Sequence, residues 1–140
     1  MSQESSAPPR LLIVDDEATI NFALWDYLVR FGFQVDRART RSEAEALLAG
    51  EPYALAIIDL RLGAAEPRGG ISLIRRVRER FPAARIILLT AYGSPEIEAE
   101  IADLGSDLLV LSKPQPLARL AEEVVKLLAR RASDPCEPAA

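Results

Sequence analysis

Several residues that could carry out chemistry stand at the ends of short apolar runs. They are Asp15, Asp16, Asp59, Thr90 and Lys113. Carboxylate oxygens are hard ligands that suit Mg²⁺, which prefers one or two carboxylates together with a phosphate. A lysine ammonium can bind a phosphoryl oxygen, and a threonine hydroxyl can donate to another. The residue types therefore indicate a divalent cation and a phosphoryl group, with Asp59 as the nucleophile, because carboxylates form acyl-phosphate intermediates.

Asp59 is the least easily explained of these residues. It closes the run Leu-Ala-Ile-Ile-Asp at 55–59, which is typical of a strand buried on both faces. Burying a carboxylate there costs several kcal/mol unless it is paired, so packing alone does not account for it. In an open parallel sheet, sites are assembled at the carboxyl ends of the strands.

Each of the other residues also has a structural explanation when it is taken alone. Asp15, Asp16 and the following Glu17 could cap the next helix and interact with its dipole. Thr90 could be an ordinary strand-end hydroxyl, and Lys113 a solvated surface charge. Their occurrence together, at the ends of four different predicted strands, favours a common site.

Alternating strands and helices would position these residues. Short apolar runs predict five strands, at 10–14, 33–37, 55–59, 85–90 and 108–111, and helical periodicity predicts a helix after each. Glycines and prolines end several helices, and Thr40-Arg-Ser-Glu43 has the spacing of a capping box. Such alternation requires a mostly parallel sheet, right-handed crossovers and helices on both faces. We therefore expect one α/β domain over 10–131, with loose tails at 1–9 and 132–140.

The composition narrows the classes of function. The 140 residues are 49% apolar and 27% charged, which is typical of a soluble globular domain. A net charge of −4 without a basic run disfavours nucleic-acid binding, and no apolar run is long enough to span a membrane. The single cysteine, Cys136, excludes an internal disulfide and favours the cytoplasm. The absence of histidine excludes histidine metal sites, histidine triads and an internal phosphohistidine.

With these residues placed, the chain resembles a receiver domain of a two-component response regulator of the CheY-like kind, from about Arg10 to about Arg131. The matching segments are Leu-Leu-Ile-Val-Asp-Asp-Glu (11–17), Ala-Ile-Ile-Asp-Leu (56–60), Ile-Ile-Leu-Leu-Thr-Ala-Tyr-Gly (86–93) and Ser-Lys-Pro (112–114). Their order and spacing make the resemblance specific. It implies a flavodoxin-like (βα)5 fold, a doubly wound parallel five-stranded sheet with strand order 2-1-3-4-5.

The resemblance also implies a phosphorylation site with Mg²⁺ as its cofactor. Asp59 would accept the phosphoryl group from a sensor histidine kinase or a histidine phosphotransfer protein, and the donor must act in trans because the chain has no histidine. Together with Asp59, Asp16 would bind Mg²⁺ directly and Asp15 largely through water, and the backbone carbonyl of Arg61 would be a further ligand. The chain would catalyse at most its own phosphorylation and dephosphorylation.

The phosphoryl oxygens would be held by Thr90 and Lys113, and the resemblance implies a cis peptide bond between Lys113 and Pro114. The sequence departs from the family at the switch position three residues before the lysine, where Val110 replaces the usual Tyr or Phe. Tyr92 is a candidate substitute. The loop at 63–70 is longer than in the family, and so, by about one residue, is the segment between Gly105 and Lys113.

Other functions could use the same fold or the same chemistry. The acidic residues after the first strand oppose a flavin phosphate site, and Arg61 stands where a phosphatase of the haloacid dehalogenase type has its second Asp. A receiver-fold module that binds partners without phosphorylation is the remaining alternative. No effector domain follows in the sequence, so we expect either a stand-alone receiver that acts through protein contacts or a shuttle in a phosphorelay, as a monomer or weak homodimer. Its protein target would bind at the fourth helix, fifth strand and fifth helix, and the acidic residues of the fourth helix favour a basic partner; they are Glu96, Glu98, Glu100 and Asp103.

Overall fold

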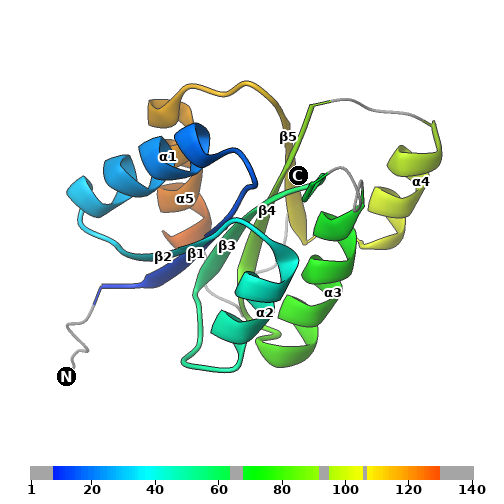
Figure 1. The fold of residues 1–140 in the computed structure, drawn as a ribbon, viewed down its shortest axis with the longest axis horizontal. Coiled ribbons are helices and arrows are strands. Elements are labelled where there is room, and N and C mark those ends of the chain that lie inside the picture. Colours follow the sequence, from blue (N-terminus) through cyan, green and yellow to red (C-terminus); the bar gives the residue numbers. More distant parts are fainter. Residues whose placement is uncertain (1–7, 64–67, 92–94, 106, 130–140) are drawn as a thin grey trace.

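The computed structural model describes residues 8–63, 68–91, 95–105 and 107–129. In this part of the chain, five strands alternate with five helices (Figure 1). The strands are β1 (Arg10–Val14), β2 (Gln34–Ala38), β3 (Leu55–Asp59), β4 (Arg85–Thr90) and β5 (Leu108–Ser112). The helices are α1 (Ala18–Arg30), α2 (Arg41–Leu48), α3 (Gly69–Arg80), α4 (Pro95–Asp103) and α5 (Leu117–Ala129).

The strands form one parallel sheet in the order β2-β1-β3-β4-β5, which confirms the predicted fold class and strand order. Val14 pairs with Ile58, Asp59 with Leu89, and Thr90 with Ser112. This register brings the carboxyl ends of β1, β3, β4 and β5 to one edge of the sheet, where the predicted site residues lie.

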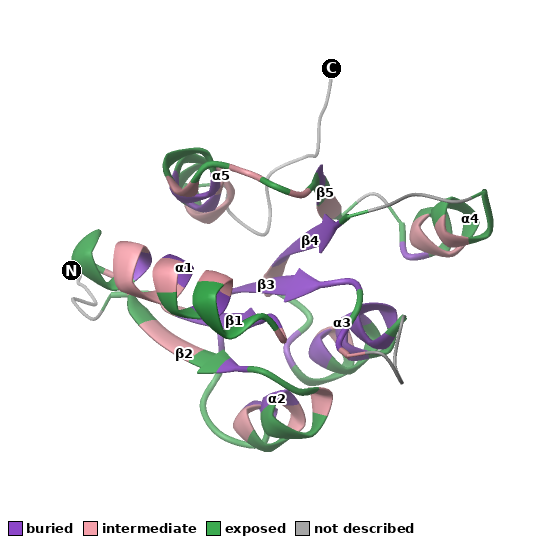
Figure 2. Ribbon diagram, turned by 45° about the horizontal axis from the view of Figure 1, so that its top comes forward, coloured by how far each residue is buried: buried purple, intermediate pink, exposed green. Residues whose placement is uncertain are grey.

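Helices cover both faces of the sheet. Helices α1 and α5 lie on one face, and α2, α3 and α4 lie on the other (Figure 1). Because side chains alternate along a strand, Leu12 and Ile58 pack toward α2 and α3, whereas Leu11 and Ile57 pack toward α1 and α5. Every residue of β3 is buried (Figure 2), as expected for the central strand of a sheet covered on both sides.

Local sequence signals account for several element ends. The Thr40 hydroxyl accepts a hydrogen bond from the Glu43 amide at 3.1 Å, so the predicted N-cap of α2 is confirmed. The Glu43 carboxylate accepts from the amide of Arg39 at 2.8 Å, one residue earlier than an ideal capping box. Gly32 follows α1 with a φ of 111°, a conformation that glycine adopts without strain. The second strand lies one residue later than predicted.

Helix α4 is less buried than the other four helices that the structure describes. None of its residues is buried, and Leu104, just after it, provides its buried anchor. Glu100, which we expected to be exposed with the other acidic residues, is half-buried and accepts from Arg68 at 2.6 Å. The sequence predicts that the arginines of α3 lie largely on its solvent-facing side. Arg78 among them is half-buried, and its side chain donates to the Leu104 carbonyl.

Some expectations fall outside the described residues. The pair Ser94-Pro95 predicts the N-cap and first turn of α4, and Ser94 lies there. So does Tyr92, the candidate substitute for the switch aromatic. So do residues 1–7 and 130–140, which contain most of the two predicted tails. Among the helices that the structure describes, none is long and apolar enough to cross a membrane.

Candidate functional site

Three carboxylates converge at the carboxyl edge of the sheet. Asp15 and Asp16 follow β1 directly, and Asp59 is the last residue of the neighbouring strand β3. Each of the three can offer an oxygen such that all three oxygens lie within 4.8 Å of one another. Asp15 and Asp59 are buried, with 2% and 6% of their surface exposed, and Asp16 is half-buried.

Lys113 brings a positive charge to the same cluster. Its Nζ lies 3.4 Å from Asp15 Oδ2, 3.4 Å from Asp59 Oδ2 and 3.5 Å from Glu17 Oε1. The lysine follows β5, and its backbone amide donates to the carbonyl of Thr90 at 2.7 Å, which fixes it against the end of β4. The peptide bond from Lys113 to Pro114 is cis, as the resemblance implies.

The surroundings shift the proton affinities of these groups. Burial, together with the nearby charge of Asp15, raises the pKa of Asp59 from its ordinary 3.8 to about 6, although Lys113 opposes the shift. Burial also raises the pKa of Asp15, against the opposing effects of the Glu17 amide and Lys113. Burial alone would lower the pKa of Lys113, but the carboxylates of Asp15 and Asp59 outweigh it and raise that pKa. The cluster thus holds negative charge that one ammonium does not neutralise.

The donor set fits a small divalent cation. The three carboxylates of Asp15, Asp16 and Asp59 and the one ammonium of Lys113 leave a formal charge of −2, without counting the more exposed Glu17. Carboxylate oxygens are the ligands that Mg²⁺ prefers, and a cation among them would stabilise the charged forms of Asp15 and Asp59, which burial disfavours.

The other predicted site residues lie at different places relative to the carboxylate cluster. Thr90 is buried at the end of β4, on the same edge as Lys113. Arg61 lies two residues beyond Asp59, and its side chain is exposed. Val110 lies opposite Leu88 in the middle of the β4–β5 ladder, with 40% of its surface exposed, so it is not part of the cluster.

The structure adds two residues that the sequence did not single out. Asn21, fully buried in α1, donates to the backbone carbonyls of Asp15 and Ala38, each at 2.9 Å. Gly70, in the first turn of α3, donates its amide to the Leu60 carbonyl at 2.8 Å and lies against the backbone of Asp59. A polar Asn on the apolar stripe of a predicted helix is a signal that could have identified the first of them.

An apolar hollow adjoins the cluster. It has a volume of about 410 Å³ and lies between α1, the end of β4 and the segment that joins β5 to α5. Lys113 and Glu17 line it on the side of the carboxylates, and the rest of its wall is largely apolar, including Ile20, Leu24 and Leu117. A partner side chain that enters this hollow would lie beside Lys113.

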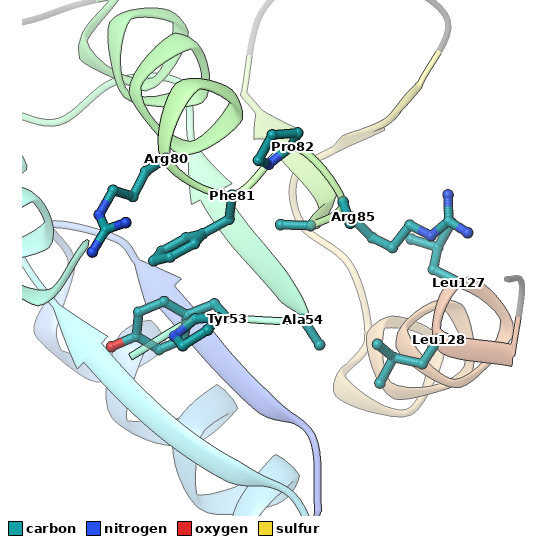
Figure 3. Close-up of a pocket in the computed structure, with 11 residues that line it drawn as sticks. Tyr53, Ala54, Arg80, Phe81, Pro82, Arg85, Leu127 and Leu128 are labelled. Carbon is teal, nitrogen blue, oxygen red and sulfur yellow. The ribbon is translucent and has the colours of Figure 1, made fainter. Parts of the chain in front are cut away.

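A second hollow of about 420 Å³ lies at the opposite end of the sheet, where β3 and β4 begin (Figure 3). Tyr53, Phe81 and Leu128 are among the residues that line it, and Arg80 and Arg85 are the charged ones among the described lining residues. The carboxylates of the cluster and Lys113 lie at the carboxyl edge of the sheet, so this hollow takes no part in their site.

Comparison with known proteins identifies relatives over nearly the whole chain. Response regulator protein PilR of Pseudomonas aeruginosa is 37% identical over 123 residues, which are 87% of this chain and 26% of that protein. Photosynthetic apparatus regulatory protein RegA of Cereibacter sphaeroides is 33% identical over 135 residues, which are 96% of this chain and 70% of RegA. The chain spans 26%, 42%, 58% and 54% of the length of four curated relatives that it matches.

Solved structures agree with the fold. A CheY-like receiver domain protein of Methanospirillum hungatei superposes with a TM-score of 0.78 at 29% identity, covering 87% of this chain and 94% of that one. A response regulator of Burkholderia pseudomallei, solved with a phosphorylated aspartic acid, calcium ion and citrate, gives 0.72 at 30% identity, covering 89% and 69%. The family model of the response regulator receiver domain matches residues 11–125. The chain belongs to the family of response regulator receiver domains.

Proposed function

We propose that the chain accepts a phosphoryl group on Asp59 in a two-component phosphorelay. The observation that carries the proposal is the placement of Asp59, a buried carboxylate at the end of β3 with Lys113 Nζ at 3.4 Å and the carboxylates of Asp15 and Asp16 beside it. The Burkholderia pseudomallei relative was solved with a phosphorylated aspartic acid, which supports the same chemistry here.

The transfer would form one bond and break one. A carboxylate oxygen of Asp59 attacks the phosphorus of a phosphohistidine, and the P–N bond breaks with its electron pair remaining on the imidazole nitrogen. The histidine belongs to a sensor kinase or phosphotransfer protein in trans, since the sequence contains none. Lys113 and Thr90 hold the phosphoryl oxygens at the ends of β5 and β4.

Asp16, Asp59 and the backbone carbonyl of Arg61 would hold Mg²⁺, with Asp15 bound largely through water. When bound, the ion neutralises charge on the oxygens of the transferring group. The buried carboxylates of Asp15 and Asp59, with their raised pKa values, are suited to this role because a cation stabilises their charged forms. Beyond its own phosphorylation and dephosphorylation, we propose no catalysis.

The output would be a change in protein binding at α4, β5 and α5. Val110 and Val125 are exposed there, at 40% and 43%, and Glu96, Glu98 and Asp103 are exposed on α4. We propose that the chain acts in the cytoplasm as a monomer or weak homodimer, and that a protein rather than nucleic acid or membrane binds this surface.

The test is incubation with phosphoramidate, a small phosphodonor, followed by intact-protein mass spectrometry. We expect one phosphoryl adduct on the wild type in Mg²⁺, and none in chelator or on Asp59→Asn. Asp26→Asn, a change in a salt bridge on the surface of α1, should still form the adduct. A folded wild type that gains no adduct would favour the alternative, a receiver-fold module that binds partners without phosphorylation.

A further inference from the structure

Asn21 is the one fully buried amide side chain among the described residues that touches the carboxylate site. It lies in the first turn of α1, with 0% of its surface exposed. Its Nδ2 donates to the carbonyl of Asp15 at 2.9 Å and to the carbonyl of Ala38 at 2.9 Å. Ala38 is the last residue of β2, so one side chain joins the ends of two strands to the helix between them.

These bonds fix the orientation of the amide. Both partners are carbonyl oxygens, which only accept, so the NH₂ group must face them and the Oδ1 must point away. The Ala38 carbonyl also accepts from the backbone amide of Asp15 at 3.1 Å. The backbone of Asp15 is therefore held through its own amide and its own carbonyl.

The other end of the amide is left without a partner. Asn21 Oδ1 is buried and has no hydrogen bond. An unpaired buried acceptor destabilises a fold, and the other buried residues of α1, Leu24 and Leu28, are apolar. Stability alone therefore does not explain an amide side chain at this buried position. The hydrogen bonds that its NH₂ group donates to the two backbone carbonyls explain it better.

The backbone that Asn21 holds positions the carboxylates of Asp15 and Asp16. With its backbone fixed, the Asp15 carboxylate accepts from the Glu17 amide at 2.9 Å through Oδ1 and lies 3.4 Å from Lys113 through Oδ2. Asp16 is the next residue, so its carboxylate also depends on this backbone. We propose that Asn21 is a positioning residue, which holds the backbone of Asp15 and Asp16 so that their carboxylates meet Asp59 at the distances a divalent cation requires.

This inference rests on the proposed function, and its test measures metal affinity rather than phosphorylation. The Mg²⁺ dissociation constant is measured by calorimetry for the wild type, Asn21→Leu and Asn21→Ser. The free energy of unfolding is measured in chelator by urea titration. We expect the dissociation constant to rise about tenfold or more in Asn21→Leu, the range seen when a residue that supports metal ligands is lost. Asn21→Ser, which keeps one donor, should show a smaller rise.

The matched control is Leu28→Ala, which removes a buried side chain from the second half of the same helix. This position is distant in sequence from Asp15 and Asp16. We expect this substitution to lower stability and to leave the dissociation constant unchanged within about twofold, because distant sites without shared partners act independently. Equal dissociation constants in Asn21→Leu and the wild type would overturn the inference and leave the proposed function intact. A failure of both Asn21 variants to fold would also overturn it. A wild type that binds no Mg²⁺ would overturn the proposed function and the inference together.

Discussion

The fold destabilises the charged form of the Asp59 carboxylate. Its pKa is raised to about 6 from 3.8, first by burial and then by Asp15. Between those values the folded chain binds more protons than the unfolded chain, so the contribution of Asp59 to the free energy of unfolding falls as pH rises from about 4 to about 6 and stays low above. We therefore predict that Asp59→Asn is more stable than the wild type at pH 7.5 by about 1–3 kcal/mol, the cost of a shift of this size.

The gain should shrink as pH falls toward 4, because the wild-type carboxyl becomes protonated in the folded state and no longer carries a buried charge. Urea unfolding of both proteins at several pH values, in chelator, measures the difference directly. Asp103→Asn, a change at an exposed position of α4, serves as the control and should give no such pH-dependent gain. A gain for Asp59→Asn that is independent of pH would contradict this account of the site.

Between elements, the approach of α3 to the end of β3 depends on Gly70. A Cβ at this position would meet the backbone carbonyl oxygen of Asp59 and would lie 2.8 Å from the Cα of Leu60. Backbone atoms cannot turn aside as a flexible side chain can, so α3 or Asp59 would have to shift. We predict that Gly70→Ala lowers the free energy of unfolding by about 1–3 kcal/mol, as overpacking does, and slows phosphorylation by phosphoramidate.

Gly50→Ala is the matched control for that substitution. Gly50 follows α2, and a Cβ there would meet only the Leu47 carbonyl, at an ordinary contact distance of 3.5 Å. We expect its stability to stay within about 1 kcal/mol of the wild type, since alanine also restricts the unfolded chain. If the two alanine variants behaved alike, the close approach of α3 to Asp59 would not be required.

At the scale of the whole molecule, the apolar hollow beside Lys113 is placed where a protein phosphodonor would dock. A protein donor must bring its phosphohistidine to Asp59, and the hollow between α1 and the β5–α5 segment offers apolar surface next to that point. We predict that Ile20→Lys, at its wall, lowers the rate of transfer from a protein donor about tenfold, the effect of losing one well-buried interface contact. The rate with phosphoramidate should not change, because a small donor needs no such surface.

Val29→Lys tests whether any charge on α1 has the same effect. Val29 is 39% exposed near the end of α1 and does not line the hollow. Radiolabelled transfer from a phosphorylated donor protein gives both rates. Equal losses with the two donors for Ile20→Lys would indicate damage to the site itself and would remove the hollow from the docking surface.

The sequence by itself determined the order of elements and the chemistry of the site. Apolar periodicity, the Thr40 cap and the glycine stops are local signals, so the strands and helices follow from them to within a residue or two at their ends. Placing Asp15, Asp59, Thr90 and Lys113 at strand ends then required only that the strands be parallel, since parallel strands share one carboxyl edge.

The tertiary structure alone decided what supports that site. Asn21 meets the carbonyl of Ala38 across 17 residues, Arg68 meets Glu100 across 32, and Gly70 lies against the backbone of β3. The hollow beside Lys113 exists only because α1 and α5 pack on the same face of the sheet. Such contacts depend on how distant segments pack, and residue type and spacing carry little information about packing.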